Sequence, residues 1–227
     1  MRRYRNGRFA VQAHTRSGRA AFRLGQGRRA KRSFATALSV YKRSKGTTKT
    51  ESLPWAAEAR YYEGELIYRD YDRIKLDVKP RRLKRTLNKK TKLLGKAQDV
   101  YLAVVEFGDP QWAMAALYRI GSVYEEFANS IREAPVPPGF SKEEAELYRQ
   151  ELDNFVIDIE EKAIEAYTAG YQKALELKVY NDYTKKIRDA LGKLAASQFP
   201  PERELRGVKR SGDRVPEFDF VEEVSRD

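Results

Sequence analysis

The chain has 227 residues, 45 Lys and Arg against 33 Asp and Glu, and a formal net charge of +12 at pH 7. This length suits one mid-sized domain or a piece of a repeat array and suffices to bury a core, and 41% hydrophobic residues argue against a disordered chain. The absence of Cys excludes disulfides and thiolate metal sites, and a single His argues against a histidine-based metal or catalytic centre.

Basic residues concentrate at the start of the chain. Residues 1–50 contain 15 Lys and Arg and no acidic residue, whereas residues 101–227 contain 17 basic and 25 acidic residues. A segment without carboxylates cannot neutralise itself, so it should attract a polyanion, an anionic membrane surface or an acidic protein face. Two simpler interpretations stay open: a basic helical face in water, and the acidic half of the same chain as the partner.

The pattern along the chain predicts helices, because alternating Val/Ile/Thr runs and Asn-Gly or Asp-Gly turns are absent. A capping residue lies just before or close to a proline at Ser52–Pro54 and at Asp109–Pro110, which predicts helix starts there. Ser141 followed by Glu144 predicts a capping box. The closely spaced prolines of residues 134–140 predict a loop. The expected fold class is therefore all-α.

An internal repeat links three segments of the chain. The first contains Gly18, Ala30, Phe34 and Ala37, so small residues lie where two helices must approach closely and an aromatic ring fills the space between them. The Ala–aromatic pair recurs at Ala97/Tyr101 and Ala163/Tyr167, and the glycine recurs at Gly64 and Gly121. The successive alanines are 67 and 66 residues apart, close to two units of about 34 residues.

The residues of this repeat resemble the motif of the tetratricopeptide repeat (TPR) family. The resemblance covers roughly residues 8–196 and implies an α-solenoid of stacked helical hairpins. Residues 11–44 fit the standard spacing, whereas glycine-to-alanine separations of 33 and 42 residues in the next two units imply two elongated hairpins. The expected units are a basic hairpin over 1–50, elongated hairpins over 51–108 and 109–178, a capping helix over 179–196, and an extended or partly disordered tail over 197–227.

A closer resemblance lies in the C-terminal part. The Pro-rich loop ending at Phe140, the segment Glu160–Tyr167 and the continuation through Leu175–Asn181 are similar to large TPR proteins of myxobacteria, including adventurous gliding motility proteins. The resemblance implies a non-catalytic scaffold for protein–protein interactions in a periplasmic or cell-envelope complex, with protein partners and no cofactor. No apolar segment follows Met1 as an export signal requires, so a cytoplasmic location is the alternative.

Catalytic patterns are weak in this sequence. Gly25–Ala30 matches the dinucleotide-binding pattern G-x-G-x-x-A, but a strand must precede that motif, and here a helix is expected. The carboxylate pairs Asp70/Asp72, Glu125/Glu126 and Glu160/Glu161 diverge around a helix instead of converging on one cleft. We therefore expect no catalytic residue, no metal site and no enzyme.

In TPR proteins the first helix of each hairpin lines a concave groove, and the resemblance places seven residues of this chain there. They are Arg19, Arg23, Tyr61, Glu65, Tyr118, Glu125 and Glu126. Such a groove runs from basic to acidic and should bind a peptide of mixed charge, with rigid aromatic rings supplying contact area. Packing between repeats explains Tyr61 and Tyr118 equally well.

An alternative function depends on a second group of residues, a basic patch. Its members are Arg28, Arg29, Arg81, Arg82, Lys84, Arg85, Lys89, Lys90 and Lys92. Among the members from Arg81 to Lys92, Leu83 and Leu87 give the sequence an amphipathic helical pattern. Such a helix could bind nucleic acid or an anionic membrane surface through several phosphate contacts. A basic helix flank in contact with water explains the same pattern.

Overall fold

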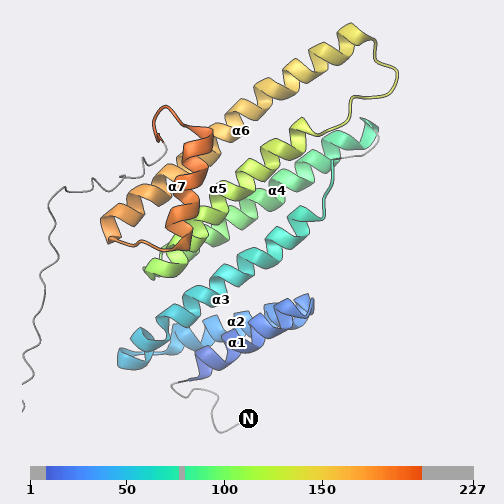
Figure 1. Cartoon of the computed structure of the whole chain (residues 1–227). Helices are drawn as coiled ribbons and strands as arrows, with labels where there is room; N and C mark the ends of the chain where they lie inside the picture. The colour runs from blue at the N-terminus through green and yellow to red at the C-terminus, as the bar shows by residue number, and fades with distance from the viewer. Residues whose placement is uncertain (1–8, 77–79, 201–227) are drawn as a thin grey trace, which may run out of the picture.

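A computed structural model describes residues 9–76 and 80–200 of the chain, apart from the side chains of residues 80 and 81. Over these ranges the chain forms helices and no strand, which confirms the all-α fold class. The helices are α1 (Ala10–Arg23), α2 (Gly27–Arg43), α3 (Gly46–Asp72), α4 (Pro80–Val105), α5 (Pro110–Arg132), α6 (Lys142–Leu177) and α7 (Asp182–Leu194) (Figure 1). Residues 201–227 of the predicted tail lie outside the described part.

The helices pack as sequential pairs, α1 with α2, α3 with α4 and α5 with α6, while α7 packs against α5 and α6. Contacts of α2 with α3 and of α4 with α5 join one pair to the next, and each odd-numbered helix also contacts the next odd-numbered helix. Figure 1 shows the pairs stacked from α1 and α2 at the bottom to α5 and α6 at the top, with α7 lying across the lower part of α6. The surface formed by α1, α3, α5 and α7 is called the odd-helix face below.

The same close contact holds each pair of helices together. A Cβ atom on Gly64 of α3 would lie 2.5 Å from a ring carbon of Tyr101 on α4, so only glycine leaves room for the ring. Gly18 is pressed as closely against Phe34, and Gly121 against Tyr167. The alanines that precede these rings by four residues, Ala30, Ala97 and Ala163, are all fully buried. The spacing of the sequence motif therefore corresponds to one packing contact made three times.

Two of the three predicted helix starts are found where the sequence places them. The Asp109 side chain accepts a hydrogen bond from the Trp112 amide at the start of α5, and Ser141 and Glu144 form a complete capping box at the start of α6. The residues between α5 and α6 include the predicted loop 134–140. Gly25 has a positive φ of 72° in the turn between α1 and α2, so the glycine-rich segment makes a helix–helix turn.

The third predicted start, at Ser52–Pro54, is wrong. Helix α3 begins at Gly46, so Pro54 lies inside it and the predicted boundary between residues 50 and 51 falls within one helix. An internal proline removes the bond from its own nitrogen to the carbonyl four residues earlier, here that of Thr50, and its ring presses against that carbonyl. Ser52 is only 2% exposed, so tertiary contacts cover the turn that the proline weakens.

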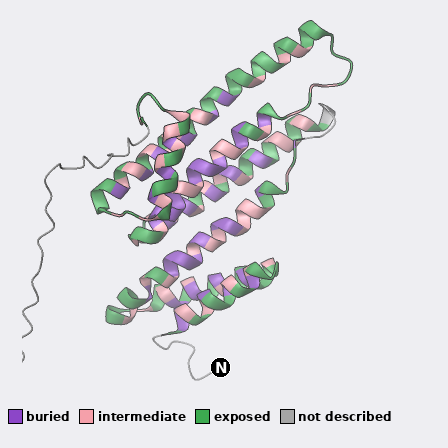
Figure 2. Ribbon diagram, in the orientation of Figure 1, coloured by how far each residue is buried: buried purple, intermediate pink, exposed green. Residues whose placement is uncertain are grey.

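Buried residues line the surfaces where the helices meet (Figure 2). Phe34, Tyr101 and Tyr167 are among the largest side chains that are fully buried. Helix α6 differs from the others because its first buried residue is Val156, so residues 142–155 remain exposed or half-buried. Figure 2 shows this end of α6 as the mostly exposed upper end of the fold.

Candidate partner-binding surfaces

The odd-helix face is crossed by polar contacts that join one helix to the next. Between α1 and α3, Arg19 donates a hydrogen bond of 2.8 Å to Glu58, whose side chain is only 4% exposed. Arg69 of α3 stacks with its guanidinium carbon 3.4 Å from the centre of the Phe22 ring and donates to the Phe22 carbonyl at 2.8 Å. Burial raises the pKa of Glu58, and the nearby Arg19 charge opposes that shift.

The contact between α3 and α5 is centred on a buried carboxylate. Arg119 donates two hydrogen bonds to Glu65, of 2.8 and 3.0 Å, and the hydroxyl of Tyr101 donates a third of 2.8 Å. The side chains of Glu65 and Arg119 are 11% and 23% exposed. Burial, followed by the negative charge of Glu65, raises the pKa of Tyr101, so this hydroxyl stays protonated and continues to donate.

Two further carboxylates on α5 are bound by tyrosines. The Tyr68 hydroxyl of α3 donates to Glu126 at 2.7 Å, and the Tyr167 hydroxyl of α6 donates to Glu125 at 3.0 Å. Burial raises the pKa of Glu126, while the Tyr68 hydrogen bond favours its charged form. Both glutamates therefore connect helices.

The seven predicted groove residues differ in burial, and some of them belong to the core. Tyr61 is only 6% exposed and packs among Tyr101 and Trp112, with ring centres 5.6 and 5.2 Å away, so it belongs to the core and not to a groove surface. Glu65 is also buried. Tyr118 is half-buried, with its ring 6.0 Å from that of Tyr183.

Arg19, Glu125 and Glu126 of the predicted groove are half-buried and bonded as described, whereas Arg23 is exposed and makes no ion pair with a described residue. The groove residues predicted from the sequence did not include Glu58 and Arg119, the partners in the two ion pairs that join odd-numbered helices. A signal was present for Arg119, because it is the single charge within the apolar run 112–124 and a charge in such a run requires a buried partner.

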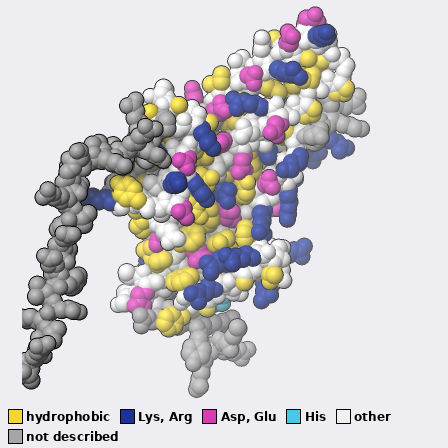
Figure 3. All heavy atoms as spheres, viewed as in Figure 1, with side chains coloured by type: hydrophobic (Ala, Val, Ile, Leu, Met, Phe, Trp, Pro, Cys, Tyr) yellow, Lys and Arg dark blue, Asp and Glu magenta, His cyan; other side chains and the backbone are white. Residues whose placement is uncertain are grey.

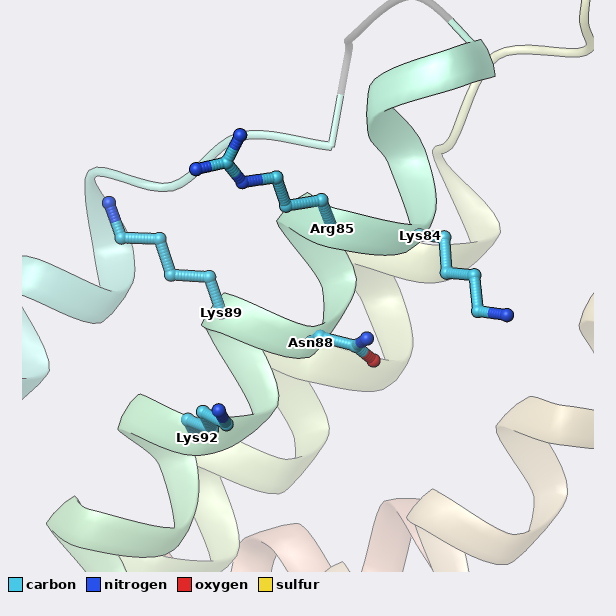
Figure 4. A pocket seen from close by; sticks show the side chains of 5 residues that line it. All are labelled: Lys84, Arg85, Asn88, Lys89 and Lys92. Carbon is cyan, nitrogen blue, oxygen red and sulfur yellow. The ribbon is translucent and has the colours of Figure 1, made fainter.

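Only some residues of the predicted basic patch lie together on one surface of the structure. Lys84, Arg85, Asn88, Lys89 and Lys92 of α4 line an open depression of about 690 Å³ (Figure 4). Figure 4 shows Arg85 and Lys89 extending from one side of the helix and Lys84 and Asn88 from the other. None of the lysines and arginines around this depression makes an ion pair with a residue of the described ranges.

Lys90 is not part of this surface, although the sequence grouped it with the others. It is 3% exposed, its ammonium donates to the Ile74 carbonyl at 2.9 Å, and it lies 4.1 Å from the centre of the Tyr71 ring. Burial lowers the pKa of this lysine. Arg28 and Arg29 are exposed on a different helix, α2, and the side chain of Arg81 lies outside the described part.

Tyr71 gives a prediction about stability at high pH. Burial raises the pKa of its hydroxyl, so the folded protein keeps a proton that the unfolded chain releases above about pH 10. The free energy of unfolding should therefore fall as pH rises from 10 to 11, by about 1 kcal/mol for this one group. Urea titrations at several pH values should show a shallower fall for Tyr71→Phe. A fall for Tyr71→Phe as steep as that of the unmodified protein would contradict this prediction.

Comparison of the chain with protein-family models, with curated proteins and with solved structures gives no match. Within the described ranges, no helix is both long and apolar enough to cross a membrane. No group of three or more Asp, Glu or His in the same ranges could hold a metal ion.

Proposed function

We propose that this protein is a TPR-like scaffold that binds a protein partner along its odd-helix face. The observation that carries the proposal is the glycine–aromatic contact made by three successive helix pairs whose odd-numbered helices also touch one another. Repeated pairs of this kind bury a continuous core and present one extended surface. The resemblance to TPR proteins of bacterial envelope complexes extends the proposal to a role in envelope assembly.

The ion pairs of the odd-helix face indicate which of its residues can contact a partner. Since Arg19 and Glu65 are bonded to neighbouring helices, they fix the spacing of the helices and leave other residues to meet a partner. Arg16 and Arg23 are the exposed cations at the α1 end, and Arg16 lies over the half-buried ring of Trp55 at 5.0 Å. An acidic segment of a partner fits this end of the face.

A matched pair of charge reversals tests the proposal. Arg16→Glu with Arg23→Glu changes the odd-helix face, and Lys42→Glu with Arg43→Glu makes the same change in net charge at exposed positions of α2. We expect the first variant to associate about tenfold more slowly with a partner identified by in-cell photo-crosslinking from Arg23, because charges at an interface mainly set the encounter rate. Equal effects of both variants, or an absence of crosslinks from the odd-helix face, would contradict the proposal.

A second candidate function rests on the cations of α4. Four of the five residues that line its depression are Lys or Arg, and they have no acidic partner in the described part of the chain. Nucleic acid or an anionic membrane surface would supply phosphates to them. If six to ten phosphates are contacted, affinity should fall by roughly 10³–10⁵-fold between 50 and 200 mM salt.

A further inference from the structure

Helix α4 carries its exposed cations in a single stripe along the helix. Positions 82, 85, 89, 92 and 96 alternate in steps of three and four residues, so they follow one another on the same face of the helix. The residues at these positions are Arg82, Arg85, Lys89, Lys92 and Lys96, and all five are exposed. At 1.5 Å per residue this basic stripe is about 21 Å long.

Helix α6 carries a stripe of the opposite charge with the same spacing. Its members are Glu144, Leu147, Glu151, Asn154, Asp158, Glu161 and Glu165, all exposed, with five acidic residues and no basic one. This acidic stripe is about 32 Å long. Glu144 contributes to the capping box, whereas Glu151, Asp158, Glu161 and Glu165 make no ion pair with a described residue.

The two stripes do not neutralise each other within one chain. Helix α4 packs on α3 and α5, helix α6 packs on α5 and α7, and no ion pair joins α4 to α6 in the described residues. Figure 3 shows Lys and Arg along the right-hand edge of the molecule, and Asp and Glu together with further Lys and Arg along its upper part. Both charged surfaces are therefore available to a partner in solution.

A second copy of this chain satisfies both stripes together. Nucleic acid or an anionic membrane would bind the basic stripe but would leave the acidic one without a partner of opposite charge. Exposed apolar side chains also flank the acidic stripe, since Phe155 is 49% and Ile157 is 52% exposed. These groups add apolar area that a phosphate backbone does not need and that a facing helix can cover.

We propose that the basic stripe of α4 docks lengthwise on the acidic stripe of α6 in a second copy of the chain. A two-fold axis between the copies would use both stripes of both chains at once, which gives a closed dimer. This self-association uses α4 and α6 and is separate from the partner contact proposed for the odd-helix face, so either proposal can fail without the other.

Charge-reversal variants of the full chain test the proposal by complementation. The basic-reversed variant carries Arg85→Glu, Lys89→Glu and Lys92→Glu, and the acid-reversed variant carries Glu151→Lys, Asp158→Lys and Glu161→Lys. All six positions are exposed, so the helices should be retained, which circular dichroism checks. Sedimentation velocity at about 0.1 M salt measures self-association under conditions where charges in contact still interact and distant ones are screened.

We expect the unmodified chain to dimerise, and we expect each variant alone to do so at least about tenfold more weakly, a loss of about 1.4 kcal/mol. An equimolar mixture of the two variants should recover the dimer, because each reversed stripe then faces an opposite one. Raising the salt to about 1 M should also dissociate the unmodified dimer. The control, Arg28→Glu with Arg29→Glu and Lys31→Glu on exposed positions of α2, makes the same charge change as the basic-reversed variant and should dimerise normally.

Three results would overturn the proposal. The first is an unmodified chain that stays monomeric at all concentrations, and the second is a mixture of variants that fails to recover the dimer. The third is a monomeric chain that binds duplex DNA or anionic vesicles near 0.15 M salt and loses this binding only in the basic-reversed variant. That last result would assign the basic stripe to a phosphate-bearing partner.

Discussion

Replacing Arg119 by Met is expected to lower the free energy of unfolding by about 3–5 kcal/mol, the typical loss when one partner of a buried ion pair is removed. The arginine supplies two of the three hydrogen bonds that Glu65 accepts, and both side chains are largely shielded from water. Without it, a carboxylate remains in a poorly solvated site with only the Tyr101 hydroxyl as a donor. Urea denaturation of Arg119→Met at pH 7 measures the loss.

An exposed ion pair provides the control for Arg119. Arg132 also donates two hydrogen bonds to one carboxylate, that of Glu160, but their side chains are 43% and 24% exposed. Arg132→Met should therefore cost less than about 1 kcal/mol, because water and salt screen such pairs. The double variant Glu65→Gln with Arg119→Met should recover part of the loss of Arg119→Met. A loss below about 1 kcal/mol for Arg119→Met would show that Glu65 gains water or another cation when the arginine is absent.

Gly64→Ala is expected to destabilise the protein although alanine is the better helix former. The new methyl group would meet the Tyr101 ring at 2.5 Å, and that ring is fully buried with its hydroxyl held by Glu65. Overpacking of this kind costs about 1–3 kcal/mol, more than the roughly 1 kcal/mol that alanine gains over glycine in a helix. Gly121→Ala should also destabilise the protein, because the side chain packed against Gly121 is the buried ring of Tyr167. Thermal or urea unfolding measures both changes.

Helix α4 contains the matched control for these glycines. Gly95 lies inside the helix, and a Cβ atom there meets no atom within 4 Å. Gly95→Ala should therefore stabilise the protein by about 0.5–1 kcal/mol. A destabilised Gly95→Ala, or a stabilised Gly64→Ala, would mean that helix propensity and not the close helix contact decides the outcome at these positions.

Several features of the fold could be predicted from the sequence because their causes are local. A cap such as Asp109 or Ser141 acts on amides two or three residues away, and closely spaced prolines exclude a helix over residues 134–140 whatever surrounds them. The repeat pattern predicted the close helix contacts because each contact imposes the same steric condition on the sequence. A glycine is needed wherever a large ring lies against a helix backbone, and the pairs Gly18/Phe34 and Gly64/Tyr101 satisfy the same steric condition.

The binding surface was harder to predict because exposure depends on residues that are distant in the sequence. Tyr61, Glu65 and Lys90 have the residue types and helical positions of surface groups, yet all three are buried. Arg23 and the five cations of the basic stripe of α4 have similar local surroundings but no described acidic partner, and they remain exposed.

The amino-acid sequence by itself determined the helical fold class, the helix caps at Asp109 and Ser141 and the positions of the close glycine contacts. Only the tertiary structure decided which charges hold helices together and which are open to a partner. The physical reason is that a charge is buried at acceptable cost only when another group binds it, and for Glu65 that group, Arg119, lies 54 residues further along the chain. The start of α3 at Gly46 was decided in the same way, by packing around a turn that Pro54 alone would weaken.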